Sequence, residues 1–339
     1  MSVHPRRLTR RAFVGVAWAL AWTLVWGAAL ALFARRAEAA SPLVLAVSSG
    51  PVSLPIYVAE SRGFFRDEGL ELQLRDCASG RECYQWLADG RVDLATAAEL
   101  LVVTGDAAHR ELAIVATICA SSSQIKLVAR RSARISEAPQ IRGRRVATVL
   151  GSSAQYFLDN WLVFNDIDPA TVTVSGMPPD QLVPALQEHR VDAIAIWEPI
   201  AASAALALAG DAVTFATERV YTQHFSLVGA RPTLERREAD VARLLRALLR
   251  AQHAIQAEPA AARALLAERL HVPPAIAATM MESQDYRVRL DQSLVTTMQG
   301  EARWVARNAG SGRASVDVLQ DIAPGPLQRI DPDAVGLVQ

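Results

Sequence analysis

The sequence predicts an α/β fold of two lobes built on mostly parallel sheets. Short apolar segments alternate with amphipathic ones along the chain, a pattern typical of βα units. The alternation is interrupted near 130–145 and again near 214–229. These interruptions divide the chain into a first part, a second part and a third part that returns to the first lobe. The chain has 339 residues, 51% of them hydrophobic, so two lobes can each bury a core.

The first forty residues are predicted to be an export signal or a membrane anchor. Ala12–Ala34 is an uncharged run of 23 residues, long enough to cross a hydrocarbon core of about 30 Å. Arg10 and Arg11 directly before it are typical of a twin-arginine signal peptide. Ala37 and Ala39 offer small residues for cleavage. We expect the remaining chain to lie outside the cytoplasm, in the periplasm or on the outer face of the cytoplasmic membrane.

Composition excludes several classes of function. The chain carries 35 basic and 35 acidic residues, and removal of residues 1–39 takes six arginines and one glutamate, which leaves 29 against 34. The exported part is therefore mildly acidic, which argues against a nucleic-acid partner. Lys126 is the only lysine, so no Gly-Lys-Ser/Thr phosphate loop exists. The sequence contains no Gly-x-Ser-x-Gly elbow and no His-x-x-x-His pair, so we expect no enzyme, cofactor or metal.

The elements follow from the alternation of apolar segments. Expected strands are Leu43–Val47, Leu70–Leu74, Leu94–Ala97, Ile114–Ile118, Lys126–Ala129, Val146–Val149, Val172–Val174 and Ala193–Ile196. Expected helices are Tyr84–Ala88, Ala154–Phe164 and Leu182–His189, followed by a helical C-terminal segment over Glu235–Asn308. We assign residues 41–129 and 225–339 to the first lobe and 130–224 to the second. Two crossings between the lobes would form a hinge.

Three segments resemble a known family. Leu54–Gln73, "LPIYVAESRGFFRDEGLELQ", has a helix that stops at Gly63 and turns back into a strand. It resembles the solute-binding proteins of bacterial ABC importers for nitrate, taurine and alkanesulfonates, a superfamily that also binds the pyrimidine precursor of thiamine. The segments "YRVRLDQSLVTTMQGEARWVARN" and "APGPLQRIDPDAVGLV" are similar to the way these chains end. The resemblance spans Leu43 to Val338.

This resemblance implies a type II periplasmic-binding-protein fold with a ligand cleft. It also implies a monomer that captures a small anion, such as an alkanesulfonate, taurine or nitrate, and delivers it to an inner-membrane ABC permease. One alternative is a binder of a thiamine-type pyrimidine precursor, and another is a membrane-tethered sensor with the same fold. The pyrimidine synthases of the superfamily carry a cysteine-rich motif that this sequence lacks.

The clearest candidate site follows the strand Val146–Val149. Ligands of open α/β sheets bind at the carboxyl ends of strands, and a helix start offers unpaired N–H groups to anions. Gly151 permits close approach of a ligand, and Ser152 and Ser153 open the next helix. Gln155 and Tyr156 offer longer polar side chains that could also contact the ligand. The alternative is that the serines only cap the helix.

Two further candidates lie at other strand ends of the first lobe. Ser53 and Leu54 follow the first strand, where the family commonly contacts its ligand, although a loop-and-cap role would explain them equally. Thr96 could donate a hydrogen bond to the ligand. Glu99 could face an amino group of the ligand, or it could simply favour a helix N-terminus electrostatically.

The remaining candidates lie near the crossings and in the second lobe. "WEP" at the end of Ala193–Ile196 resembles nitrate- and taurine-type binding proteins. Trp197 could form a wall of the site or pack in the core, and Glu198 could accept from a ligand ammonium group. Ser122 and Ser123 supply hydroxyls at the first crossing.

The chain has three cysteines. In an oxidising compartment Cys77 and Cys83 could close a small loop as a disulfide, with two thiols as the alternative. Cys119 is expected to be buried and free.

Overall fold

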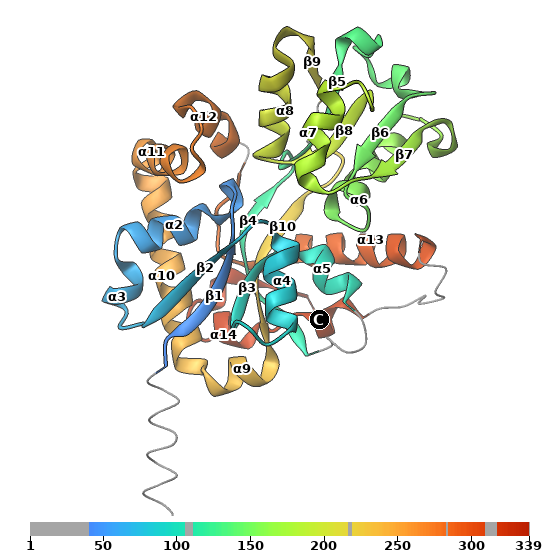
Figure 1. Ribbon diagram of the computed structural model, residues 1–339. Helices are drawn as coiled ribbons and strands as arrows, with labels where there is room; N and C mark the ends of the chain where they lie inside the picture. The colour runs from blue at the N-terminus through green and yellow to red at the C-terminus, as the bar shows by residue number, and fades with distance from the viewer. Residues whose placement is uncertain (1–40, 106–110, 216–218, 283, 309–316, 339) are drawn as a thin grey trace, which may run out of the picture. The chain divides into compact units, whose positions relative to one another are not determined.

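The computed structural model describes residues 41–105, 111–215, 219–282, 284–308 and 317–338. The predicted export segment therefore lies outside the described residues. From Leu43 onward the described chain forms one compact unit that holds two five-stranded sheets (Figure 1). None of the described helices is long and apolar enough to span a membrane.

The first sheet combines N-terminal strands with one that returns from later in the chain. Its order is β2 (Leu72–Cys77), β1 (Leu43–Ser48), β3 (Leu94–Ala98), β10 (Gln223–Ala230) and β4 (Leu112–Ser121). β1 is parallel to β2 and β3, whereas β10 runs antiparallel to β3 and β4. β3 and β4 are buried along their whole length, which explains their near-continuous apolar sequences.

The second sheet has the same plan. Its order is β7 (Thr173–Gly176), β6 (Arg145–Thr148), β8 (Ala193–Trp197), β5 (Ile125–Arg130) and β9 (Ala212–Thr214). β6 is parallel to β7 and β8, and β5 is the reversed strand, antiparallel to β8 and β9. Each sheet thus contains one antiparallel strand, and in each case it is the strand that follows a crossing. The predicted two-lobed α/β fold is confirmed.

One strand lies in a different lobe from the one predicted. We expected Lys126–Ala129 in the first lobe, but β5 pairs with β8 and β9 of the second sheet. The first crossing is therefore at 122–124, several residues before the predicted boundary at 129. The sequence pattern of an apolar strand does not show whether it is the last strand of the first sheet or the first strand of the second. The return crossing lies between β9 and β10.

Helices cover the sheets. Those that pack with the first lobe are α2 (Leu54–Ser61), α3 (Phe64–Asp67), α4 (Gly80–Ala88), α5 (Glu99–Thr104), α9 (Arg231–Arg236), α10 (Glu238–Ala257), α11 (Pro259–Leu270), α12 (Pro274–Glu282), α13 (Gln292–Asn308) and α14 (Gly325–Gln328). Those of the second lobe are α6 (Ser153–Phe164), α7 (Pro179–Gln187) and α8 (Ile200–Leu208). A short parallel pair joins β11 (Leu290–Asp291) to β12 (Val335–Gly336).

Separate hydrophobic cores stabilise the two lobes. In the first lobe α2 and α10 pack with the apolar residues of the first sheet. In the second lobe Phe157 and Trp161 of α6 form one cluster with that sheet, while Leu182 and Leu186 of α7 belong to another. Trp304 of α13 reaches the α6 cluster, and its ring nitrogen donates to Asp159 Oδ2 at 2.7 Å. Helix α13 therefore contacts both lobes.

Candidate functional site

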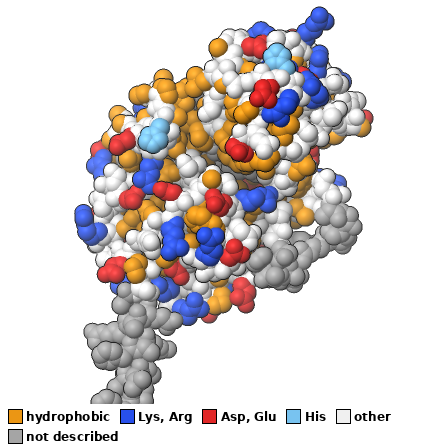
Figure 2. Space-filling model, in the orientation of Figure 1, with side chains coloured by type: hydrophobic (Ala, Val, Ile, Leu, Met, Phe, Trp, Pro, Cys, Tyr) orange, Lys and Arg blue, Asp and Glu red, His pale blue; other side chains and the backbone are white. Residues whose placement is uncertain are grey.

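A cavity that is partly open to solvent lies between the two sheets. It is found at the carboxyl ends of β1, β3 and β8, the edge where α/β sheets bind ligands. Figure 2 shows hydrophobic side chains beside the hollow between the lobes. The lining residues are Ser48, Ser49, Gly50, Val52, Ser79, Gly80, Arg81, Ala98, Leu100, Leu101, Gln124, Ser152, Ser153, Trp197, Glu198, Gln223 and Phe225.

The start of α6 forms the polar end of the cavity in the second lobe. Gly151 adopts a left-handed conformation with φ of 68°, which turns the chain into the helix. Ser152 is the N-cap, since its Oγ accepts from Ala154 N at 3.1 Å and donates to Val149 O at 2.6 Å. Ser153 Oγ accepts from Gln223 Nε2 at 2.8 Å, a contact that joins the lobes. The helix dipole and the hydroxyl hydrogen of Ser153 remain available to an anion.

The loop after β1 presents its backbone to the cavity because two buried side chains hold it. Ser48 N donates to Thr96 Oγ1 at 2.9 Å. Ser53 Oγ donates to Ser48 O at 2.8 Å. Both Thr96 and Ser53 are fully buried. These two predicted ligand contacts therefore lie behind the cavity wall, while Ser48 and Ser49 line it.

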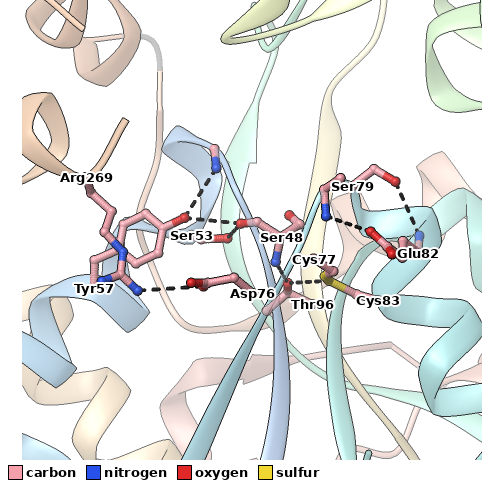
Figure 3. The surroundings of a disulfide bond; sticks show 12 residues. Ser48, Ser53, Tyr57, Asp76, Cys77, Ser79, Glu82, Cys83, Thr96 and Arg269 are labelled. Carbon is pink, nitrogen blue, oxygen red and sulfur yellow. Dashed lines mark hydrogen bonds and ion pairs between the residues drawn. A yellow bond between two sulfur atoms is a disulfide. The ribbon is translucent and has the colours of Figure 1, made fainter. Parts of the chain in front are cut away.

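The turn into α4 is closed by a disulfide between Cys77 and Cys83, whose Cα atoms lie 5.7 Å apart (Figure 3). Two hydrogen bonds reinforce it, because the N-cap Ser79 Oγ accepts from Glu82 N at 3.3 Å and Glu82 Oε2 accepts from Ala78 N at 2.7 Å. Gly80 packs closely here, since a Cβ atom would lie 3.3 Å from the Phe225 ring. The turn thus brings Ser79, Gly80 and Arg81 to the cavity.

Apolar side chains form the remaining wall. Val52, Leu100, Leu101 and Phe225 come from the first lobe, and Trp197 at the end of β8 faces them from the second. Trp197 also packs against both second-lobe clusters, so it has the predicted wall position and a packing role together. The cavity is therefore amphiphilic, with polar and apolar side chains from both lobes in its lining.

Glu198 lines the cavity, but its carboxylate is already paired. Oε1 lies 3.4 Å from Lys126 Nζ, and Oε2 accepts from Ala202 N at 2.9 Å. Burial raises the pKa of Glu198, and the Lys126 charge opposes that rise. Its main-chain oxygen accepts from Gln124 Nε2 at 3.1 Å. The carboxylate thus anchors α8 to β5.

A second polar group, the buried carboxyl cluster, lies beside the cavity and consists of Glu99, Tyr221, His224 and Glu301. The Tyr221 hydroxyl bonds to Glu99 Oε1 at 2.7 Å and to Glu301 Oε1 at 3.0 Å. His224 N donates to Glu99 Oε2 at 3.0 Å. Both carboxyl groups are fully buried. Glu99 therefore does not line the cavity.

Burial sets the ionisation of this cluster. It raises the pKa of Glu99 to about 7 and that of Glu301 well above its usual range. It also lowers the pKa of His224 to about 4. One tyrosine hydrogen cannot serve two carboxylates, so a protonated carboxyl group suits this geometry. At neutral pH burial thus favours the uncharged forms of Glu301 and His224, while Glu99 is near its midpoint.

The other predicted site residues support the lining rather than form it. Leu54 belongs to the first core. Gln155 Oε1 accepts from Gly151 N at 2.7 Å and fixes that turn. The Tyr156 ring meets the ring of Tyr221 edge-on at 5.0 Å. Ser122 and Ser123 lie at the first crossing, outside the lining.

Several lining residues were not predicted. Ser79 and Gly80 follow β2 directly, so the strand-end rule could have found them. Gln124 and Gln223 flank the two crossings, where only the correct sheet assignment would have shown their position. Cys119 is a buried thiol. The described residues contain no group of His, Cys, Asp and Glu side chains that could hold a metal ion.

Comparisons with known proteins agree with this architecture. A model of the family described as "NMT1/THI5 like" matches residues 50–262. A protein of Escherichia coli (strain K12) named "Putative aliphatic sulfonates-binding protein" is 24% identical over 257 residues, which are 74% of this chain and 78% of the relative. The resemblance inferred from sequence is thereby confirmed.

Two solved structures show the same fold. The periplasmic aliphatic sulphonate binding protein SsuA from Escherichia coli has a TM-score of 0.71 at 21% identity and covers 83% of this chain and 98% of its own. The desulfurization enzyme DSZB has a TM-score of 0.63 at 17% identity and covers 86% of this chain and 99% of its own. The fold therefore serves both binding and catalysis, and the cavity residues must decide between them.

Proposed function

The chain belongs to the NMT1/THI5-like family, and from the chemistry of its cavity we propose that it is an exported solute-binding protein that delivers an aliphatic sulfonate to an ABC importer. One observation carries the proposal. The N-terminus of α6 and Ser153 face a cavity whose lining also contains the apolar side chains of Val52, Leu100, Leu101, Trp197 and Phe225. A ligand with an anionic head and a hydrocarbon tail satisfies both parts.

The polar end favours an anion. Helix α6 is 12 residues long, and its first N–H groups and dipole favour negative charge. Ser153, whose Oγ accepts from Gln223 Nε2, keeps its hydroxyl hydrogen to donate to an oxyanion. Glu198 is the acidic residue among the lining residues, and Lys126 and Ala202 N already engage it. A sulfonate head group would therefore meet donors without strong repulsion.

The apolar wall favours an organic ligand over nitrate. A hydrocarbon chain beside Leu101, Trp197 and Phe225 adds affinity in proportion to the apolar area that the chain removes from water. Nitrate offers no such area. Taurine and a pyrimidine precursor carry amino groups that would need an acceptor, and the Glu198 carboxylate is engaged elsewhere. An alkanesulfonate fits better than these alternatives.

Closure of the lobes would trap the ligand, because the lining comes from both of them. A hinge equilibrium shifts only by the ligand's preference for the closed form, so contacts to both lobes are what drive closure. No histidine or cysteine occurs among the described residues that line the cavity, and its serines therefore lack a neighbouring base there. We accordingly assign binding and release, without turnover, to this site.

Thermal unfolding against a ligand panel tests the proposal. We would purify the chain from residue 41, free it of ligand by unfolding and refolding, and add butanesulfonate, octanesulfonate, taurine, nitrate or an aminopyrimidine. A ligand at 100 times its dissociation constant should stabilise the fold by about 2.7 kcal/mol. We expect this shift with the alkanesulfonates. A shift with nitrate or the aminopyrimidine alone, or loss of ligand to a product, would overturn the proposal.

A further inference from the structure

We propose that Arg81 determines the charge specificity of this site by holding the anionic head group of the ligand while it bridges the two lobes. This inference rests on the proposed function, because it assumes that an anion occupies the cavity. It adds a residue that lies outside the serine-rich turns and that no sequence pattern marked. The evidence is the position of its guanidinium group.

Arg81 is the cation among the described residues that line the cavity. It lies in the first turn of α4 in the first lobe, and its Nη2 donates to Gly151 O in the second lobe at 2.6 Å. Gly151 directly precedes Ser152 and Ser153 at the start of α6. The guanidinium group is therefore brought to the turn that we assign to the anionic head group.

Arg81 has hydrogen-bond capacity left for a ligand. A guanidinium group has five N–H donors in a planar fork that matches the oxygens of an oxyanion. Gly151 O takes one of them. Within the described part of the chain no ion pair between a carboxylate and Arg81 is found, in contrast to Arg250, which pairs with Asp67. A sulfonate at the start of α6 would supply the missing counter-charge.

The turn that carries Arg81 is held in place. The Cys77–Cys83 disulfide and the hydrogen bonds of the Ser79 and Glu82 side chains to Glu82 N and Ala78 N fix the backbone on both sides of it (Figure 3). The backbone that carries Arg81 is therefore fixed before a ligand arrives, which lowers the entropy cost of binding. Its contact with Gly151 exists only while the lobes are close together. A ligand that engages Arg81 and α6 at once therefore favours the closed form.

Isothermal titration with a charged and a neutral ligand of the same shape tests this inference. We would compare butanesulfonate with butanesulfonamide on the unmodified chain and on Arg81→Met. Loss of a charge-assisted hydrogen bond should weaken butanesulfonate binding by about 10- to 100-fold. Butanesulfonamide binding should change by less than about threefold, because a neutral head group gains little from the cation. The ratio of the butanesulfonate affinity to the butanesulfonamide affinity should therefore fall strongly in Arg81→Met.

Arg263→Met is the matched control, since Arg263 is an exposed arginine on α11, outside the cavity lining. It should bind both ligands as the unmodified chain does. If Arg81→Met weakened both ligands equally, Arg81 would have only a structural role and the inference would be wrong. Unchanged butanesulfonate affinity in Arg81→Met would also overturn it. Failure of the unmodified chain to bind butanesulfonate would instead count against the proposed function.

Discussion

The cavity and the buried carboxyl cluster are neighbours built from similar residues, yet their polar groups are satisfied in opposite ways. Both begin at a helix start that follows a strand, Ser153 in α6 and Glu99 in α5. In the cavity Ser153 Oγ accepts from Gln223 Nε2, which leaves its hydroxyl hydrogen available to a ligand. In the cluster Tyr221 and His224 N satisfy the Glu99 carboxyl group completely. Polar residues thus bind a ligand or stabilise the fold according to whether the protein itself already supplies their partners.

Removal of Tyr221 should produce the largest effect and should separate the two regions most clearly. Tyr221→Ala deletes a buried ring and leaves two carboxyl groups without their shared partner. We expect the free energy of unfolding to fall by about 3–5 kcal/mol. Urea unfolding measures this directly.

Phe164→Ala is the control for that measurement, because Phe164 is 56% exposed. Its effect should stay within about 0.5 kcal/mol. A loss below 1 kcal/mol for Tyr221→Ala would mean that the cluster contributes little to stability. The contrast with the cavity would then disappear.

The pH dependence of stability sharpens the comparison further. The pKa of Glu99, about 7 in the fold, and the pKa of Glu301 are raised above the usual 4.5, so both groups contribute stability that is lost as pH rises. The pKa of His224, lowered from 6.5 to about 4, contributes stability that is lost as pH falls. Glu99 and His224 therefore offset each other between about pH 4.5 and 6.5. Of these three groups, Glu301 is the one whose contribution to stability still declines above pH 7.

Glu301→Gln isolates that contribution, since the amide mimics the protonated carboxyl group. Between pH 7 and 9 we expect the unmodified chain to lose up to about 1.4 kcal/mol of stability per pH unit. Glu301→Gln should flatten this slope. Glu235→Gln, at an exposed position, should leave it unchanged. Urea unfolding at several pH values compares the three chains, and equal slopes would refute the assignment of Glu301 as a buried neutral acid.

The sequence predicted the frame of the molecule well, because strands depend on local apolar patterns. Leu94–Ala97 was expected and β3 covers Leu94–Ala98. Helix α4, in contrast, begins at Gly80 rather than Tyr84, since the Ser79 cap extends it. The lobe that contains β5 could not be read locally, because membership of a sheet depends on β8 and β9, which come much later in the chain.

The site was predictable only in part, because partners from distant segments decide what a side chain does. The strand-end rule correctly placed Ser153 at the cavity. The same rule failed for Glu99, whose hydrogen-bond partner Tyr221 lies 122 residues away. Arg81 gave no local signal, since its contact with Gly151 spans 70 residues and both lobes.

Ser153→Ala should give the smallest effect, and it tests the other side of the comparison. Ser153 Oγ accepts from Gln223 Nε2 and faces the cavity, so its loss removes one neutral hydrogen bond to the ligand. We expect alkanesulfonate affinity to fall by about 2- to 10-fold, which titration calorimetry resolves. Ser203→Ala, an exposed serine on α8, should leave affinity unchanged.

Stability should respond differently from affinity in this variant. Gln223 is buried but lines the cavity, where water can take the place of Ser153 Oγ, so Ser153→Ala should cost about 1 kcal/mol of unfolding free energy. A large loss of stability with unchanged affinity would place Ser153 with the buried carboxyl cluster as a structural residue. Loss of affinity with intact stability would show that its hydroxyl group serves the ligand. The cavity and the buried carboxyl cluster would then differ in function, because the Ser153 hydroxyl group bonds to a ligand whereas the Tyr221 hydroxyl group bonds within the protein.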